Sequence, residues 1–203
     1  MQVLPAGHEA LLVELSLPAE VPLLYADLRR DLACADLVPG ARTVLLDGVA
    51  DLDAARDYLA RWVPAGGSAD SIGPLVELAT TYDGADLDDV ARRWGMTRAE
   101  AVATHTGTEL TVAFVGFAPG FAYCTGLPPE LSVPRLDRPR ARVPAGAVGL
   151  AGEYTGVYPT ASPGGWRLVG RTDARLWDTD RDEPALLTPG TRVRFVEVTE
   201  VTG

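Results

Sequence analysis

Four segments in the second half of the chain combine backbone-restricting prolines, backbone-freeing glycines and side chains that could bind a small ligand. They span residues 116–123, 133–135, 142–146 and 155–166, and we expect them to be loops, where binding and catalytic residues usually lie. Because proline fixes φ and glycine allows φ above zero, such segments can hold one shape. In the last one we expect Tyr158 and Ser162 to offer hydroxyl groups for catalysis. Gly164 and Gly165 would offer backbone amides and Trp166 an aromatic wall, so the segment suits a small planar amide, urea or carboxylate.

The same composition has a purely structural interpretation. Glycine and proline also close the tight turns of a β-barrel, and for any single segment this alternative is the stronger one. Four such segments in one half of the chain favour a binding site, to which Tyr123 of the first segment would contribute.

Two arginines and one histidine extend the candidate site. Arg135 and Arg171 could each grip a carboxylate or carboxyphosphate with two parallel hydrogen bonds, although the chain has sixteen other arginines that compete for this role. His105 could act as a general base near neutral pH, but a position at the end of a capped helix explains it equally well. We predict no metal site, because Cys34 and Cys124 lack ligand spacing.

Composition excludes several classes of function. The net charge of −10 and the absence of a basic run argue against a nucleic-acid partner. All 18 basic residues are arginines, which excludes lysine Schiff bases, a lysine-bearing phosphate loop and covalent biotin attachment. No ATP-binding motif is present. Residues 1–15 have no cationic start and no 18 apolar residues run together, so we expect a cytoplasmic protein outside the membrane.

The elements expected before residue 72 form an α+β unit. Leu11, Val13 and Leu15 alternate as in a half-buried strand, and apolar residues then recur at helical spacing over 21–37. A turn at 39–40, a strand at 42–46 and a helix that begins at Asp51 and stops at Pro64 complete a β-α-β-α order. With a further strand at 75–81, this order suits a ferredoxin-like domain over residues 1–72, and the small-residue connector 64–73 marks its end.

The remaining residues, 73–203, are expected to form a second domain. Two short helices at 86–94 and 97–105, the second opened by a Thr97/Glu100 capping box, imitate a helix-turn-helix. A helical connector is the better interpretation, because the second helix offers one arginine and no basic flank. Short apolar strands at 110–115, 147–150, 166–169 and 192–198, separated by glycine and proline, then favour a closed or nearly closed β-barrel.

The sequence resembles a known family, the bacterial 5-oxoprolinase B subunits (PxpB). This family is also called allophanate hydrolase subunit 1 or the KipI family, and it belongs to the carboxyltransferase-domain superfamily. Seven motifs fall in the family's order and spacing: Phe117–Tyr123, Pro134–Arg135, Val143–Val148, Thr155–Pro159, Ser162–Trp166, Gly170–Thr172 and Pro189–Gly190. The resemblance covers nearly the whole chain and is strongest from about Tyr82 to Phe195.

The resemblance implies an N-terminal α+β domain, a cyclophilin-like β-barrel and a complex with other proteins. The expected partners are the C subunit of the complex, which is similar to allophanate hydrolase subunit 2, and a separate hydrolytic subunit. With them the chain would open 5-oxoproline to L-glutamate at the expense of ATP bound through the complex. Two alternatives stay open. One is a carboxyltransferase-like subunit acting on urea or another small amide, and the other is an inhibitor of a sensor histidine kinase.

Overall fold

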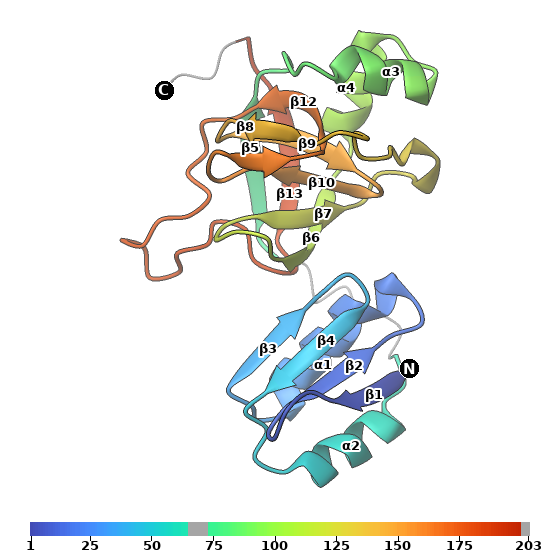
Figure 1. Cartoon of the computed structure of the whole chain (residues 1–203), viewed down its shortest axis with the longest axis vertical. Coiled ribbons are helices and arrows are strands. Elements are labelled where there is room, and N and C mark those ends of the chain that lie inside the picture. Colours follow the sequence, from blue (N-terminus) through green and yellow to red (C-terminus); the bar gives the residue numbers. More distant parts are fainter. Residues whose placement is uncertain (65–72, 200–203) are drawn as a thin grey trace. The chain divides into compact units, whose positions relative to one another are not determined.

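The chain forms two compact units, Met1–Ile72 and Gly73–Gly203 (Figure 1). This computed structural model describes residues 1–64 and 73–199. The expected connector and the expected domain boundary near residue 72 therefore lie almost entirely outside the described residues.

The first unit is a four-stranded antiparallel sheet with two helices. Its elements are β1 (Gln2–Pro5), β2 (Leu11–Glu14), a 3₁₀ helix (Pro18–Glu20), α1 (Val21–Asp31), β3 (Asp36–Pro39), β4 (Thr43–Asp47) and α2 (Leu52–Arg61). The strand order is β1-β2-β4-β3, so β2 and β3 run parallel on either side of β4 and α1 connects them. This split β-α-β arrangement is the one found in ferredoxin-like sheets, here with an edge strand at the start of the chain.

Two of the elements expected here are wrong in detail. The helix expected over 21–37 ends at Asp31, because Leu32 is extended, and Asp36–Pro39 pairs with β4 as a strand. The alternation of half-exposed residues in this short edge strand is too weak to be distinguished from a helical end. The strand expected at 75–81 forms, but it belongs to the second unit. Asp51 caps α2 as expected, since its carboxylate accepts hydrogen bonds from the Asp53 and Ala54 amides.

The second unit is a nearly closed barrel with two helices. Its elements are β5 (Leu75–Thr80), α3 (Leu87–Trp94), α4 (Arg98–Gly107), β6 (Leu110–Val115), β7 (Ala122–Thr125), a 3₁₀ helix (Pro129–Leu131), β8 (Arg140–Val143), β9 (Ala147–Ala151), β10 (Tyr154–Val157), β11 (Ser162–Gly164), β12 (Arg167–Arg171) and β13 (Arg192–Glu197). Seven strands follow the order β12-β9-β10-β7-β6-β13-β5. Thr81 and Arg171 exchange two backbone hydrogen bonds of 2.9 Å, which join the two edges of the sheet.

Parts of the segments expected as loops are strands. β11 lies within one of them and β7, β8 and β10 overlap them in part, and β8 and β11 pair as a separate two-stranded sheet. These strands were not predicted because they contain glycine, which a sequence pattern assigns to turns; Gly156 in β10 is an example. A Cβ there would come within about 3 Å of the Ala122 carbonyl and the Trp166 ring, so β10 can approach β7 this closely only without a side chain.

The two helices pack on the barrel, α3 against β12 and α4 against β13. The capping box at the start of α4 is confirmed, since Thr97 and Glu100 each bond the other's backbone amide. No helix in the part of the chain that the structure describes is long and apolar enough to cross a membrane.

Candidate functional site

A pocket of about 220 Å³ opens on the barrel unit between β11, the start of β7 and the segment before β8. Its lining combines aromatic side chains, one cation and exposed glycine backbone. The lining residues are Phe117, Phe121, Tyr123, Arg135, Pro139, Tyr158, Pro163, Gly164, Gly165 and Trp166. The structure thus brings together six of the nine residues selected from the sequence, namely Tyr123, Arg135, Tyr158, Gly164, Gly165 and Trp166.

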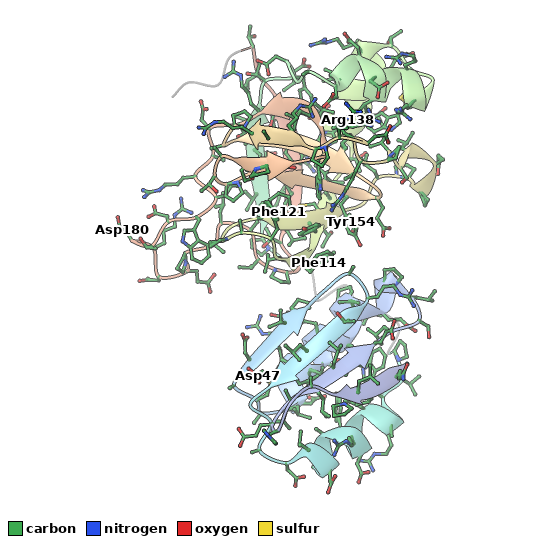
Figure 2. All side chains as sticks on the ribbon, viewed as in Figure 1. Asp47, Phe114, Phe121, Arg138, Tyr154 and Asp180 are labelled. Atoms are coloured by element: carbon green, nitrogen blue, oxygen red, sulfur yellow. The ribbon has the colours of Figure 1, made fainter. Side chains whose placement is uncertain are left out.

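The walls of the pocket form one aromatic cluster around Phe121, a residue that Figure 2 labels on the barrel unit. The Phe121 ring lies 5.0 Å from Tyr123, 5.4 Å from Tyr158 and 5.2 Å from Trp166, centroid to centroid, and its contacts with Tyr158 and Trp166 are edge-to-face. Such pairs stabilise each other beyond the area that they bury. The cluster therefore presents rigid, flat walls to a ligand.

Phe117 lies at the rim of the pocket in a strained backbone conformation. Its φ of 70° is the only positive value at a non-glycine residue among those described. The Ala118 amide donates to the Gly116 carbonyl at 2.9 Å, which makes Phe117 the centre of a γ-turn of the rare, positive-φ type. The side chain is 62% exposed, so burial does not explain the strain. Strain of this kind in an exposed aromatic residue is typical of ligand sites.

Tyr158 depends on a glycine for its position. Its ring is buried, and a side chain at position 164 would collide with its hydroxyl, so Gly164 leaves the space that this hydroxyl occupies. Burial raises the pKa of Tyr158, although a hydrogen bond from the Trp166 backbone and the charge of Arg135 oppose the effect. The pKa of Tyr123 is raised for the same main reason. Both phenols are therefore neutral near pH 7 and can donate a hydrogen bond.

Arg135 is exposed, but the segment that carries it is fixed on both sides. The Arg167 side chain donates to the Pro134 carbonyl at 2.9 Å, and the Leu136 amide donates to the Gly165 carbonyl at 2.8 Å. Arg167 is itself paired with Asp89 of α3. The Arg135 guanidinium is thus available to a ligand while its backbone is held at the pocket.

A second ion pair fixes the β8–β11 wall of the pocket. Arg140 donates two hydrogen bonds of 2.7 and 2.8 Å to Asp86, whose carboxylate also accepts the Leu168 amide at 2.7 Å. Arg140 also reaches the Trp166 carbonyl at 3.3 Å. Bidentate pairs of this kind restrict geometry as well as supply energy, so β8 is held against α3 and β12.

The comparisons with known proteins agree with this architecture. The family profile described as "Carboxyltransferase domain, subdomain C and D" matches residues 1–187. The chain belongs to this family. The 5-oxoprolinase B subunit of Escherichia coli O157:H7 is 45% identical over 145 residues, which are 70% of this chain and 66% of that protein. The 5-oxoprolinase B subunit of Bacillus subtilis (strain 168) is 40% identical over 129 residues, 62% of this chain and 54% of that protein.

Among solved structures, the protein TTHA0988 superposes with a TM-score of 0.78 at 33% identity. The match covers 97% of this chain and 41% of TTHA0988. The chain therefore spans about two thirds of the first of these three proteins, about half of the second and 41% of the third.

Three residues selected from the sequence lie outside the pocket. His105 is buried between α4 and the barrel, with the Tyr82 hydroxyl 2.6 Å from Nδ1 and the Thr155 hydroxyl 3.3 Å from Nε2. Burial lowers its pKa to about 4. These surroundings are those of a hydrogen-bonded core histidine that joins α4 to β10, and its catalytic role stays a prediction.

Arg171 and Ser162 do not line the pocket. Arg171 ends β12, where its Nε donates to Asp83 at 2.8 Å. Ser162 begins β11, two residues before Gly164, and its buried hydroxyl oxygen has no hydrogen-bond partner among the described residues. Their roles in binding and catalysis also stay predictions.

Sequence reasoning did not select four lining residues, Phe117, Phe121, Pro139 and Pro163, of which Pro163 lies in the segment 155–166 that was singled out. The two phenylalanines lie in the segment 116–123 that was singled out, and aromatic residues next to glycine and proline were the available signal. Pro139 gave no signal, because it enters the pocket only through the fold of the segment before β8.

Proposed function

We propose that this chain is a non-autonomous subunit of an ATP-dependent complex that cleaves 5-oxoproline to L-glutamate. The observation that carries the proposal is the coincidence of two independent features. The curated relatives at 40–45% identity are 5-oxoprolinase B subunits, and the pocket combines a cation, neutral phenols and flat aromatic walls. These groups match a small planar lactam that carries a carboxylate.

Each part of such a substrate has a matching group in the pocket. The Arg135 guanidinium can grip the carboxylate with two hydrogen bonds. The Tyr158 hydroxyl, which burial keeps neutral, can donate to the amide carbonyl and favour the negative charge that develops there during ring opening. Trp166 and Phe121 supply flat apolar walls, and the Gly164 and Gly165 backbone allows close approach.

We place the ATP site elsewhere in the complex. The pocket of about 220 Å³ is small beside the roughly 300–1,000 Å³ of typical cofactor and drug sites, which suits a lactam better than a nucleotide. The chain also lacks a glycine-rich phosphate loop with its lysine. ATP would supply activation of the unreactive amide by phosphoryl or carboxyl transfer. We propose the C subunit of 5-oxoprolinase and a separate hydrolytic subunit as partners, in the cytoplasm.

The test is reconstitution from purified subunits. This chain, the C subunit and the hydrolytic subunit are mixed with 5-oxoproline and ATP, and glutamate and ADP are measured. We expect glutamate release to require all three proteins. If the full set releases no glutamate, or if omission of this chain changes nothing, the proposal fails. Replacing 5-oxoproline by urea tests the alternative substrate class in the same assay.

Two variants test the roles in the pocket. Arg135→Ala should raise KM for 5-oxoproline, since a charge-assisted hydrogen bond contributes about 1.5–3 kcal/mol, or roughly tenfold to a hundredfold. Tyr158→Phe should lower kcat and leave the fold intact. Arg138→Ala is the matched control, because Arg138 is an exposed arginine of the same segment that does not line the pocket (Figure 2). Normal turnover in both pocket variants would remove these residues from the site.

A further inference from the structure

A second hollow of about 290 Å³ lies on the other side of the Gly116–Gly120 turn. We call it the Trp177 groove. Its lining is almost wholly apolar and consists of Val115, Gly116, Phe117, Ala118, Pro119, Gly120, Trp177, Ala185, Leu187, Thr188 and Pro189. Two of the large exposed hydrophobic side chains of the described residues lie in it, Trp177 at 40% and Phe117 at 62% exposure. A concentration of exposed aromatic residues around a hollow is characteristic of protein interfaces.

The groove is a formed structure and not a chance gap. Trp177 belongs to the long excursion between β12 and β13, which leaves the barrel and returns to it (Figure 1). Backbone hydrogen bonds of 2.9 Å, from Leu186 to Leu176 and from Asp178 to Pro184, cross-link the two arms of the excursion. The buried Leu176 and Leu187 anchor its base. Trp177 is therefore held outward on an ordered arm.

Close packing also fixes the opposite side of the groove. Gly120 has a φ of 82°, and a Cβ at this position would lie 3.0 Å from the Cβ of Trp177 and 3.1 Å from the Leu176 carbonyl. Only glycine allows the Gly116–Gly120 turn to contact the arm in this way. The same turn carries Phe117, which lines both the groove and the ligand pocket.

The excursion carries four exposed acidic residues, which we call the acidic rim. Asp173, Asp180, Asp182 and Glu183 are exposed, and none of them pairs with a cation in residues 1–64 and 73–199. Asp180 lies at the far end of the excursion (Figure 2). The two arginines of the arm, Arg175 and Arg181, are both engaged by Asp178. The local charge is thus negative and uncompensated, as is the net charge of −10 of the whole chain.

We infer that the Trp177 groove is the docking surface for another protein of the complex, which presents an apolar side chain flanked by lysine or arginine. Because interfaces are complementary in polarity and charge, the surface that binds here should present an apolar side chain surrounded by basic residues. A hollow of this volume accepts one large side chain, the usual form of an interface anchor. The partner's identity as the C subunit rests on the proposed function.

The test is the affinity of the purified C subunit for this chain, measured by biolayer interferometry. We expect Trp177→Ala to weaken binding by about 30-fold, the effect of losing one interface anchor. Val196→Ala, at an exposed apolar residue of β13 outside the groove, should leave binding unchanged. Equal affinity of wild type and Trp177→Ala would overturn the inference. Absence of binding by the wild type would instead refute the proposed partnership itself, and with it this surface.

The acidic rim is tested by charge reversal. The double variant Asp180→Arg/Asp182→Arg should slow association and flatten its dependence on salt, since rim charges act mainly on the encounter rate. Glu130→Arg, an exposed acidic residue away from the excursion, is the control. An unchanged association rate of the double variant would overturn the inference that the partner presents lysine or arginine to this surface. If the wild type instead forms a dimer that Trp177→Ala dissociates, the occupant is a second copy of this chain and the inference is wrong.

Discussion

His105 allows a quantitative prediction, because the pKa of its imidazole in the folded chain differs from that in the unfolded chain. Burial lowers the pKa of the imidazole from its ordinary value of 6.5 to about 4. Between these two values the unfolded chain binds a proton that the folded chain does not. The free energy of unfolding therefore falls as the pH falls from about 6.5, and this contribution is lost completely near pH 4.

The magnitude follows from the two pKa values. At about 1.4 kcal/mol for each pH unit, the interval from 6.5 to about 4 corresponds to a loss of roughly 3 kcal/mol. Compensation by a neighbouring anion is small, since the groups in contact with the imidazole are the hydroxyls of Tyr82 and Thr155 and the ring of Phe195. The Tyr82 hydroxyl stays neutral, because burial raises its pKa.

The assay compares urea denaturation of the wild type and His105→Gln between about pH 7.5 and 4.5. A Trp62→Phe background removes the one tryptophan of the first unit, so fluorescence reports only on residues 73–203. We expect the variant to be less stable near neutral pH, through lost packing, and the difference to shrink by about 2–3 kcal/mol on acidification. Carboxylates titrate equally in both proteins and cancel in the difference. Parallel pH profiles would refute the reasoning and show that the imidazole is accessible to protons in the folded chain.

Three further predictions concern the pocket and the residues that support it. Gly164→Ala should displace the Tyr158 hydroxyl and lower turnover without unfolding, while Gly165→Ala, whose Cβ would lie 3.6 Å from its nearest neighbour, should leave the Tyr158 hydroxyl in place. Phe117→Gly should be about 1 kcal/mol more stable than Phe117→Ala by thermal denaturation, because only glycine relieves a φ of 70°, and equal stability would contradict the strained γ-turn. Asp86→Asn should lower stability by about 2 kcal/mol in urea titrations, since it breaks a partly buried bidentate pair, and a loss below about 0.5 kcal/mol would show that the pair is solvated.

Sequence patterns predicted most of the elements that depend on local signals. The alternation of Leu11 and Val13 identified β2, and both capped helix starts, at Asp51 and Thr97, were located correctly. Side chains that bond their own backbone within three residues leave a direct mark on the sequence. The nearly closed barrel was also predictable, from short strands separated by glycine and proline.

Two strands in and beside the pocket, β10 and β11, were not predictable by this route, although of these only β11 contributes lining residues. β10 and β11 contain Gly156, Gly164 and Pro163, which a sequence pattern assigns to turns. They are strands because neighbouring side chains fill the space that a Cβ would occupy, as the Tyr158 hydroxyl does at Gly164. The reason for glycine at position 164 is therefore found in Tyr158, which packs against it, and not in the residues of β11 themselves. The sequence therefore indicated residues such as Gly164 as part of the site through their chemistry, but the loop conformation predicted for them was wrong.

The two ion pairs that support the pocket could not be predicted from the sequence either, because each joins residues far apart in the chain. Arg140 pairs with Asp86 and Arg167 with Asp89, across 54 and 78 residues of sequence. With 18 arginines and 28 acidic residues, no spacing rule selects these partners. Both acids lie at α3, so one short helix holds the β8–β11 wall and, through the Arg167 bond to the Pro134 carbonyl, the segment that carries Arg135. The position of Arg135 is therefore set by other arginines that do not line the pocket, and a change at α3 should alter KM for the substrate although α3 contributes no residue to the lining.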